Sequence, residues 1–201
     1  MKAVILLNGE PYTGSLEQDG YVYCCDGAYA WAKDKIKIDE NVGDFDSLRE
    51  TPVPPPAIVY PAEKNFTDGE IAVRRAIRAG ADQIVIYGAF GLRCDHFLGN
   101  LHLLYLAYQN GVPARMISER EEIFWGAGLV ELNGYAGKTL SIVPFGANAH
   151  IMESSGLKYP LHELDLVYGS TRGISNIAER DEAHVFAQGC VLVIINRGGE
   201  H

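Results

Sequence analysis

The sequence predicts an α/β N-terminal domain with a mainly parallel sheet, followed by an all-β C-terminal sandwich domain. In residues 1–118, short apolar runs alternate with segments of helical periodicity, which is typical of parallel strands covered by helices on both faces. In residues 119–201, short β-like runs are separated by Gly, Pro and Asn, which indicates a small antiparallel sandwich or barrel. We therefore expect two domains that meet near residue 118.

The first elements follow from short apolar runs. Residues 3–7 and 21–25 are predicted strands, and the second strand leads into a short helix at 28–33. Residues 58–60 form a further strand. The proline cluster before it must be an extended connection, because proline has no N–H to donate to a ladder.

The rest of this domain contains two helices around one strand. Thr67 and Glu70 have the spacing of a capping box, so a helix begins at Thr67, and Gly80 ends it. Residues 84–87 form a buried strand, and a strongly apolar helix follows at about 95–109. The face of this last helix that we expect to be buried is formed by Leu98, Leu101, Leu104, Tyr105 and Tyr108.

Four β-like runs are the predicted strands of the second domain. They lie at residues 123–125, 140–143, 184–186 and 191–195. Turn residues separate them at intervals that favour strands joined by turns over strands joined by helices.

The composition narrows the range of partners. The formal net charge is -9, and so acidic a surface argues against nucleic acid or an anionic membrane, both of which need a basic face. A nucleotide is still compatible, because a divalent metal can neutralise its phosphates. No apolar run could span a bilayer, the first run is too short for a signal peptide, and the four cysteines lack metal-binding spacing. We therefore expect a cytoplasmic protein with free thiols.

The first candidate site is a pair of carboxylates, Asp44 and Asp46, one residue apart and next to Gly43. In a loop after a strand both can converge on one cation, and Mg²⁺ usually takes one or two protein carboxylates plus substrate phosphates. The alternative is a solvated turn, because Asp, Gly and Ser are common there. The segment by itself leaves both interpretations open.

The second candidate site is the start of the helix at Thr67. Backbone N–H groups at a helix N-terminus attract phosphate, and Lys64 adds a positive charge just before it. Asp68 lies in the first turn and could face the same metal as Asp44. The alternative is that Thr67 and Asp68 only cap the helix, and the two roles can coexist.

The third candidate site is the glycine-bearing loop at residues 88–93 and the helix start that follows it. Such a loop after a buried strand is where α/β proteins place ligands, and Arg93 can bind phosphate in a fork. Asp95, His96 and Asn100 place polar groups at the start of an otherwise apolar helix. The loop lacks the Gly-Lys-Ser/Thr ending of a P-loop.

These segments are expected to meet at one place. The acids that follow predicted strands are Asp26, Asp44, Asp46, Asp68 and Asp95. The carboxyl ends of parallel strands share one edge of the sheet, and acids gathered there repel each other unless a cation neutralises them. With Lys64 and Arg93 nearby, the combination favours chemistry on a metal–polyphosphate complex.

Six stretches of the chain, in this order, resemble the sequence motifs of the thiamine pyrophosphokinase family. The family shows an Asp-Gly-Gly element, then Gly-Asp-x-Asp-Ser, Lys-Asp-x-Thr-Asp and Gly-Gly-Arg-x-Asp-His, and later Ser-x-Gly-Leu-x-Trp or Tyr and Gly-x-Ser-Asn. The matching segments are residues 26–28, 43–47, 64–68, 91–96, 154–159 and 173–176. The match covers both predicted domains, and the joint occurrence of six elements is specific where each alone is not.

The resemblance implies transfer of the β,γ-diphosphate of ATP to the hydroxyl of thiamine, leaving AMP. It also implies a nucleotide- and metal-binding domain at 1–118, a thiamine-binding β-sandwich at 119–201, and a homodimer with active sites at the subunit interface. Mg²⁺ would be held by Asp44, Asp46 and Asp68, and the catalytic set would be these three acids with Asp95. The implied ATP contacts are Lys64, Thr67, Arg93, His96 and Asn100. The implied thiamine contacts are Asp26, Tyr159, Ser175 and Asn176, with Asp26 or Asp95 facing the reacting hydroxyl.

Four positions depart from the family pattern. Ala28 and Leu92 replace usual glycines, Asn65 replaces a typical aspartate, and Tyr159 takes a position often held by tryptophan. Asp68, the expected metal ligand, is intact. The departures therefore bear on rate and affinity rather than on the class of reaction.

Two other functions are compatible with the same residues. One is a related diphosphokinase that acts on a pterin alcohol with the same metal and ATP. The other is a non-catalytic thiamine- or nucleotide-binding protein that has lost turnover through Asn65 and Leu92. Release of AMP with thiamine, compared with a pterin alcohol, discriminates between the three.

Overall fold

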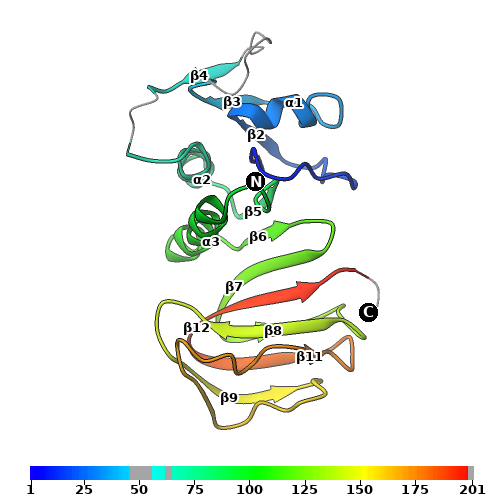
Figure 1. Cartoon of the computed structure of the whole chain (residues 1–201). Helices are drawn as coiled ribbons and strands as arrows, with labels where there is room; N and C mark the ends of the chain where they lie inside the picture. Colours follow the sequence, from blue (N-terminus) through cyan, green and yellow to red (C-terminus); the bar gives the residue numbers. More distant parts are fainter. Residues whose placement is uncertain (46–55, 62–64, 199–201) are drawn as a thin grey trace. The chain divides into compact units, whose positions relative to one another are not determined.

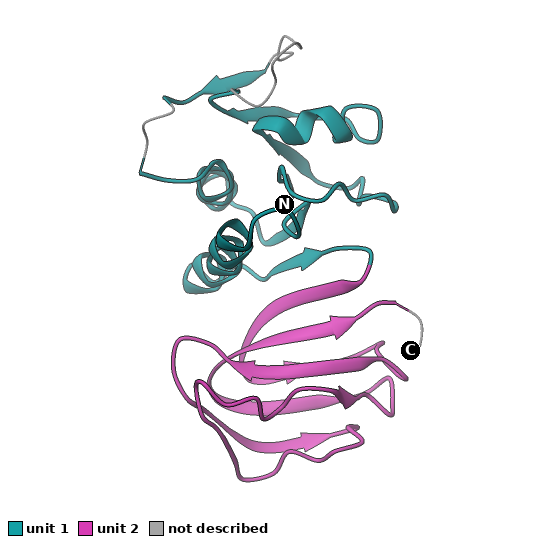
Figure 2. Cartoon of the chain, in the orientation of Figure 1, with its two compact units in different colours: residues 1–119 teal, residues 120–201 magenta. Residues whose placement is uncertain are grey.

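The computed structural model describes residues 1–45, 56–61 and 65–198 of the chain. The chain divides into two compact units, Met1–Glu119 and Arg120–His201 (Figure 2). Each unit has its own sheet pattern, parallel in the first and antiparallel in the second. No helix in the described ranges is long and apolar enough to cross a membrane.

The first unit is built on a parallel sheet (Figure 1). Its strands are β1 (Lys2–Leu6), β2 (Tyr21–Cys25), β3 (Glu40–Gly43), β4 (Ala57–Val59), β5 (Gln83–Tyr87) and β6 (Ala114–Ile117). Their order across the sheet is β6-β5-β1-β2-β3-β4, and each of these neighbouring pairs is parallel. The parallel sheet expected from the alternation of strands and helices is therefore present.

Helices cover both faces of this sheet. They are η1 (Asp26–Ala28), α1 (Tyr29–Ala32), α2 (Asp68–Arg78) and α3 (Cys94–Gln109). Ala28 and Ala32 pack into a core cluster with alternate residues of the strands, such as Leu6 and Cys24, so α1 covers that face. Figure 1 shows α2 and α3 on the other side of the sheet.

The start of α2 confirms the capping prediction. The backbone N–H of Glu70 donates to the Thr67 hydroxyl at 3.2 Å, and Thr67 is the N-cap. Gly69 then lies so close to Leu7 and Leu103 that a Cβ there would come within 3.1 Å of each side chain. The glycine therefore lets the first turn of α2 pack tightly beside β1 and α3.

The buried face predicted for α3 is wrong in part. Leu101 and Leu104 are buried, but Leu98 is 55% exposed. Tyr105 and Tyr108 are also exposed, at 36% and 40% of their surface. The helix is apolar around most of its circumference, so periodicity alone does not identify which stripe packs against the sheet.

The sequence prediction also missed β6. Its run is only four residues long and contains Arg115, whose guanidinium pairs with Glu17 at 2.6 Å. A short strand with a paired charge carries little apolar pattern, and its place beside β5 depends on the tertiary fold.

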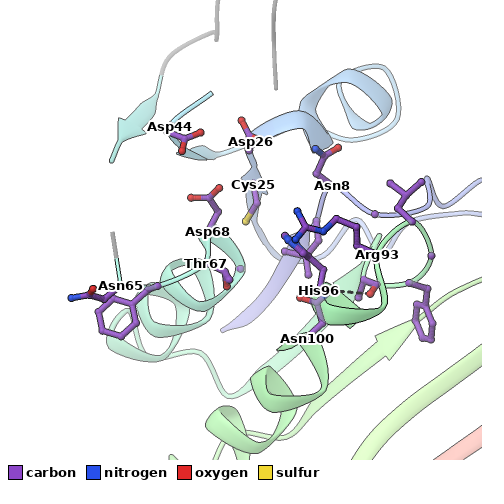
Figure 3. Close-up of a pocket in the computed structure, with 18 residues that line it drawn as sticks. Asn8, Cys25, Asp26, Asp44, Asn65, Thr67, Asp68, Arg93, His96 and Asn100 are labelled. Atoms are coloured by element: carbon purple, nitrogen blue, oxygen red, sulfur yellow. Dashed lines mark hydrogen bonds between the residues drawn. The ribbon is translucent and has the colours of Figure 1, made fainter. Parts of the chain in front are cut away.

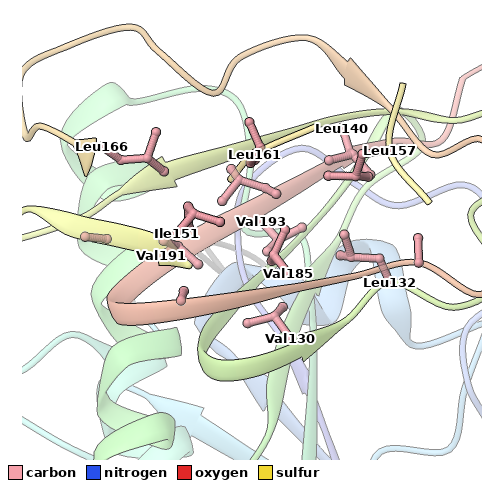
Figure 4. Close-up of a cluster of buried hydrophobic side chains, with 14 of the residues drawn as sticks. Val130, Leu132, Leu140, Ile151, Leu157, Leu161, Leu166, Val185, Val191 and Val193 are labelled. Carbon is pink, nitrogen blue, oxygen red and sulfur yellow. The ribbon is translucent and has the colours of Figure 1, made fainter. Parts of the chain in front are cut away.

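The second unit is antiparallel. Its strands are β7 (Glu121–Glu131), β8 (Thr139–Pro144), β9 (Ala149–Ser155), β10 (Leu164–Leu166), β11 (Asn176–Ile177) and β12 (His184–Asn196). Along one edge β12 pairs with β7, and along its other edge it pairs first with β9 and then with β8. A core that includes Leu140, Ile151 and Val193 fills the space between these strands (Figure 4).

Two predicted strands of this unit are one strand in the structure. The runs at 184–186 and 191–195 both belong to β12, and the pairing register with β7 shifts between Ala187 and Val191. The polar and small residues at this irregularity interrupt the apolar pattern, which is why the sequence predicts two elements.

Candidate active site

A pocket of about 690 Å³ lies at the carboxyl edge of the parallel sheet, within the first unit (Figure 3). Side chains reach it from the ends of β1, β2 and β3 and from the starts of α2 and α3. The expected site residues that line it are Asp26, Asp44, Thr67, Asp68, Arg93, His96 and Asn100. Parallel strands bring their carboxyl ends to one edge, so segments far apart in the sequence meet here.

Three carboxylates form the centre of this site. One oxygen each from Asp26, Asp44 and Asp68 lies within 4.8 Å of the others. Asp26 follows β2, Asp44 follows β3, and Asp68 is the first residue of α2. The expected meeting of acids from separate loops therefore occurs for these three residues.

The backbone around Asp26 has a local cause for this arrangement. Asp26 has a φ of 45°, a left-handed conformation that is unfavourable for a residue with a Cβ. Gly43 lies against it, and a Cβ on Gly43 would come 3.1 Å from the Cβ of Asp26. The glycine thus allows the end of β3 to approach Asp26 closely and places Asp44 beside it.

The site fits a hard divalent cation such as Mg²⁺. Asp26 is only 8% exposed, and its buried Oδ1 has no hydrogen-bond partner within the described part of the chain. A buried carboxylate oxygen without a donor costs free energy, which a cation beside it would offset. Three carboxylates on one side of an open pocket are also the oxygen-rich ligand set that Mg²⁺ prefers.

Residues expected to contact the nucleotide line the same pocket. Thr67 and Asn100 also have structural partners, because the Thr67 hydroxyl caps α2 and the Asn100 amide donates to the Ala89 carbonyl at 2.9 Å. His96 and Arg93 reach the pocket from the start of α3 (Figure 3). Capping and a place in the pocket therefore coexist at Thr67.

Asp95 has a different environment from the three clustered acids. Its carboxylate pairs with Arg93 at 2.6 Å and accepts the backbone N–H of His96 at 2.9 Å. The Arg93 hydrogen bond lowers the pKa of Asp95 to about 2. Asp95 does not line the pocket in the described residues, and a carboxylate of so low a pKa is a weak base at neutral pH. Its catalytic role stays a prediction from the resemblance.

Two expected site residues, Asp46 and Lys64, lie outside the described residues.

The pocket is also lined by residues that the sequence did not single out as site residues, among them Asn8, Cys25 and Phe66. Asn8 follows β1 at the same edge as Asp26 and Asp44, so the strand-end argument could have found it. Nothing in the local pattern marks Phe66, which is exposed and stacks with the guanidinium of Arg74.

The three residues expected to contact thiamine from the second unit do not share one environment. Tyr159 is 55% exposed, and Ser175 is also exposed, with a left-handed φ of 60°. Asn176 is buried, at 3% exposed. Its side-chain amide bonds to the backbone of Tyr159.

A parallel α/β unit that gathers three carboxylates, a guanidinium and a helix start around one strand-end pocket is typical of enzymes that act on phosphate groups with a divalent metal. Two family models match the chain. "Thiamin pyrophosphokinase, catalytic domain" matches residues 12–116, and "Thiamin pyrophosphokinase, vitamin B1 binding domain" matches residues 129–190. The chain belongs to the thiamin pyrophosphokinase family, whose members are diphosphokinase enzymes.

Individual relatives agree with this assignment. The chain is 34% identical over 164 residues to the thiamine pyrophosphokinase of Bacillus subtilis (strain 168), with 77% of each chain covered. The crystal structure of thiamine pyrophosphokinase from Bacillus subtilis superposes with a TM-score of 0.85, at 28% identity and 98% coverage of each chain. The structure of the Geobacillus thermodenitrificans thiamin pyrophosphokinase shares the fold, with a TM-score of 0.84, 24% identity, and coverage of 100% of this chain and 99% of that one.

Proposed function

We propose that the protein transfers the β,γ-diphosphate group of ATP to the hydroxyl of thiamine. The thiamine oxygen forms a bond to the β-phosphorus, the bond from that phosphorus to the oxygen bridging to the α-phosphorus breaks, and AMP leaves. The hydroxyl proton is released as thiamine diphosphate forms. The observation that carries this proposal is the meeting of Asp26, Asp44 and Asp68 in one pocket with Arg93.

The acidic residues would hold Mg²⁺ with the phosphates of ATP. The proposed ligands are Asp44 and Asp68, with Asp46 from the sequence pattern, and the position of Asp26 adds a fourth carboxylate to the set. When bound, Mg²⁺ neutralises charge on the polyphosphate and on the leaving group. Asp26 is therefore proposed here on the metal side of the pocket, in addition to the thiamine contact that the resemblance implies.

The remaining pocket residues would bind and orient the phosphate chain. The backbone N–H groups at the start of α2 favour negative charge, and Lys64 precedes them in the sequence. Arg93 can form a forked pair with a phosphate, and in doing so it would exchange its present partner, Asp95. His96 and Asn100 lie beside it on α3. Placement of the reacting groups accounts for much of the rate in this chemistry.

The thiamine side of the proposal rests on the second unit. The family model for vitamin B1 binding covers Tyr159, Ser175 and Asn176. A flat cationic thiazolium binds well against an aromatic face, and Tyr159 presents an exposed ring. We also propose a homodimer with active sites at the subunit interface, as the resemblance implies.

The experiment is an assay of AMP formation with ATP, Mg²⁺ and either thiamine or a pterin alcohol. AMP is expected with thiamine and not with the pterin alcohol. Asp44→Asn is expected to lower the rate by on the order of 100-fold or more, because it removes a charged metal ligand while keeping its shape. Asp46→Asn tests the sequence prediction at the neighbouring position in the same way.

Asp34→Asn is the matched control, since Asp34 is an exposed aspartate that does not line the pocket. It should leave the rate unchanged. Full activity of Asp44→Asn, or AMP released only with the pterin alcohol, would contradict the proposal.

A further inference from the structure

The side chain of Asn176 makes three hydrogen bonds to backbone groups of the second unit. Its Nδ2 donates to the Tyr159 carbonyl at 2.7 Å, and its Oδ1 accepts the Tyr159 N–H at 3.1 Å. The same Oδ1 also accepts the N–H of Ile177 at 2.8 Å. An amide side chain has two acceptor positions and two N–H donors, so only one N–H is left for anything else.

These bonds continue a ladder between two segments. Leu157 and Ala178 form an antiparallel bridge, and the Lys158 N–H donates to the Ile177 carbonyl at 2.9 Å. The Asn176 amide takes the next place in this ladder and pairs with both backbone groups of Tyr159, as a strand residue would. Pro160 follows and has no N–H to extend the pairing.

The flanking residues anchor the Tyr159 segment on both sides. Leu157 and Leu161 are 5% and 7% exposed and belong to the core of the unit (Figure 4). Tyr159 lies between them, with its backbone held by Asn176, and the residue is 55% exposed. The ring is therefore presented on a fixed backbone. This lowers the entropic cost of ordering Tyr159 when a ligand stacks on its ring.

A positive charge already lies over the Tyr159 ring in the structure. The ammonium of Lys158 lies 5.7 Å from the centroid of the Tyr159 ring. A cation over an aromatic face is the contact that a thiazolium would make. Asn176, at 3% exposed, presents almost no surface to such a ligand.

We propose that Asn176 is a positioning residue that holds Tyr159 as the aromatic platform for the thiamine ring, and that it does not itself contact thiamine. This inference rests on the proposed function. It replaces a direct ligand contact, which the motif suggests, with an indirect role that the hydrogen bonds support. Its consequence is that the effect of Asn176 on thiamine binding passes through the Tyr159 ring.

A double-mutant cycle tests this dependence. The apparent KM for thiamine is measured for the wild type, Asn176→Ala, Tyr159→Ala and the double variant, with the KM for ATP and the thermal midpoint alongside. Each single variant is expected to raise the KM for thiamine by about tenfold, the scale of one or two lost hydrogen bonds or a lost stacking contact. The double variant should be no worse than Tyr159→Ala, because the platform is already absent. Effects that multiply would overturn the proposal.

Asn176→Asp is a second, independent test of the proposal if the alanine variant does not fold. It keeps the oxygen that accepts the Tyr159 N–H but places an oxygen against the Tyr159 carbonyl. A positioning role predicts weaker thiamine binding, whereas direct contact with a cationic ligand predicts equal or tighter binding. Equal or tighter binding would overturn the proposal.

Ser154→Ala is the matched control, since Ser154 accepts the backbone N–H of Leu161 at 2.8 Å, two residues beyond Tyr159. It should leave the KM for thiamine nearly unchanged. A rise as large as that of Asn176→Ala would show a general loss of local structure and would contradict the specific role. If the wild type forms no AMP with thiamine, the proposed function itself fails, which is distinct from multiplying effects in an active enzyme.

Discussion

Leu92 shows how a single residue carries local strain beside the pocket. Its φ is 56°, and the residue lines the pocket while remaining 82% exposed. The left-handed conformation costs an L-residue roughly 1–2 kcal/mol, which explains why the family pattern has glycine here. The backbone of the loop is therefore kept although the residue that suits it is absent.

At position 92, a glycine variant should be more stable than an alanine variant, which is the reverse of the usual order. Both variants remove the exposed side chain, but only glycine relieves the left-handed strain, so Leu92→Gly should be more stable than Leu92→Ala by about 1 kcal/mol. Urea unfolding of the two variants measures the difference. An alanine variant at least as stable as the glycine variant would show that the loop does not hold this conformation in solution.

The site residues differ in how far the sequence could predict them. Asp44 and Asp68 follow from their positions after a strand and at a helix start, and they meet as expected. Asp26 was also expected at this edge because it follows a strand, and it lies beside them, but no sequence pattern shows its left-handed φ of 45°. The burial of Asn176 depends on pairing with a residue 17 positions away, a contact that only the tertiary fold creates.

At the scale of elements, the ends of β2 and β3 determine the geometry of the proposed metal site. Gly43 allows these ends to approach, because a Cβ there would lie 3.1 Å from the Cβ of Asp26 and 3.2 Å from its Cα. Asp44 is the next residue in the chain, so the close approach at Gly43 also brings Asp44 near Asp26. The spacing of two carboxylates therefore depends on a residue that has no side chain.

Gly43→Ala should weaken the proposed metal site without removing any of its proposed ligands. We expect the Mg²⁺ concentration for half-maximal AMP formation to rise by about tenfold. Residues that hold metal ligands in position typically contribute about 10- to 100-fold to metal affinity. A Mg²⁺ titration of activity measures this. Gly99→Ala is the control, because a Cβ at Gly99 meets nothing within 4 Å. An unchanged Mg²⁺ requirement in Gly43→Ala would contradict the role assigned to the close approach.

The helices and strands were predicted best where a local signal marks them. The capping residues of α2 placed its start at Thr67, and buried apolar runs placed β1, β2 and β5. The exposed side of α3 was not predicted, because the helix is apolar on most sides and only its neighbours decide which side is covered. Short strands such as β6 and β11 have too few residues to show a period.

At the scale of the whole molecule, the change in sequence character near residue 118 corresponds to a change from parallel to antiparallel pairing. The first unit carries the acidic pocket, and the second carries the exposed Tyr159 whose backbone is bonded to the buried Asn176. The alternation of elements was sufficient to predict a parallel sheet, and the sheet in turn brings the strand ends together. The strand-end rule is therefore the link between the sequence and the proposed chemistry.

The most direct test of that link is a crystal structure with Mn²⁺ in place of Mg²⁺, a non-hydrolysable ATP analogue and thiamine. We expect an anomalous peak for Mn²⁺ between Asp26, Asp44 and Asp68, with phosphate oxygens completing its coordination. Carboxylates that remain apart, or a cation bound elsewhere while these three residues face solvent, would contradict a shared metal site and the phosphotransfer chemistry built on it.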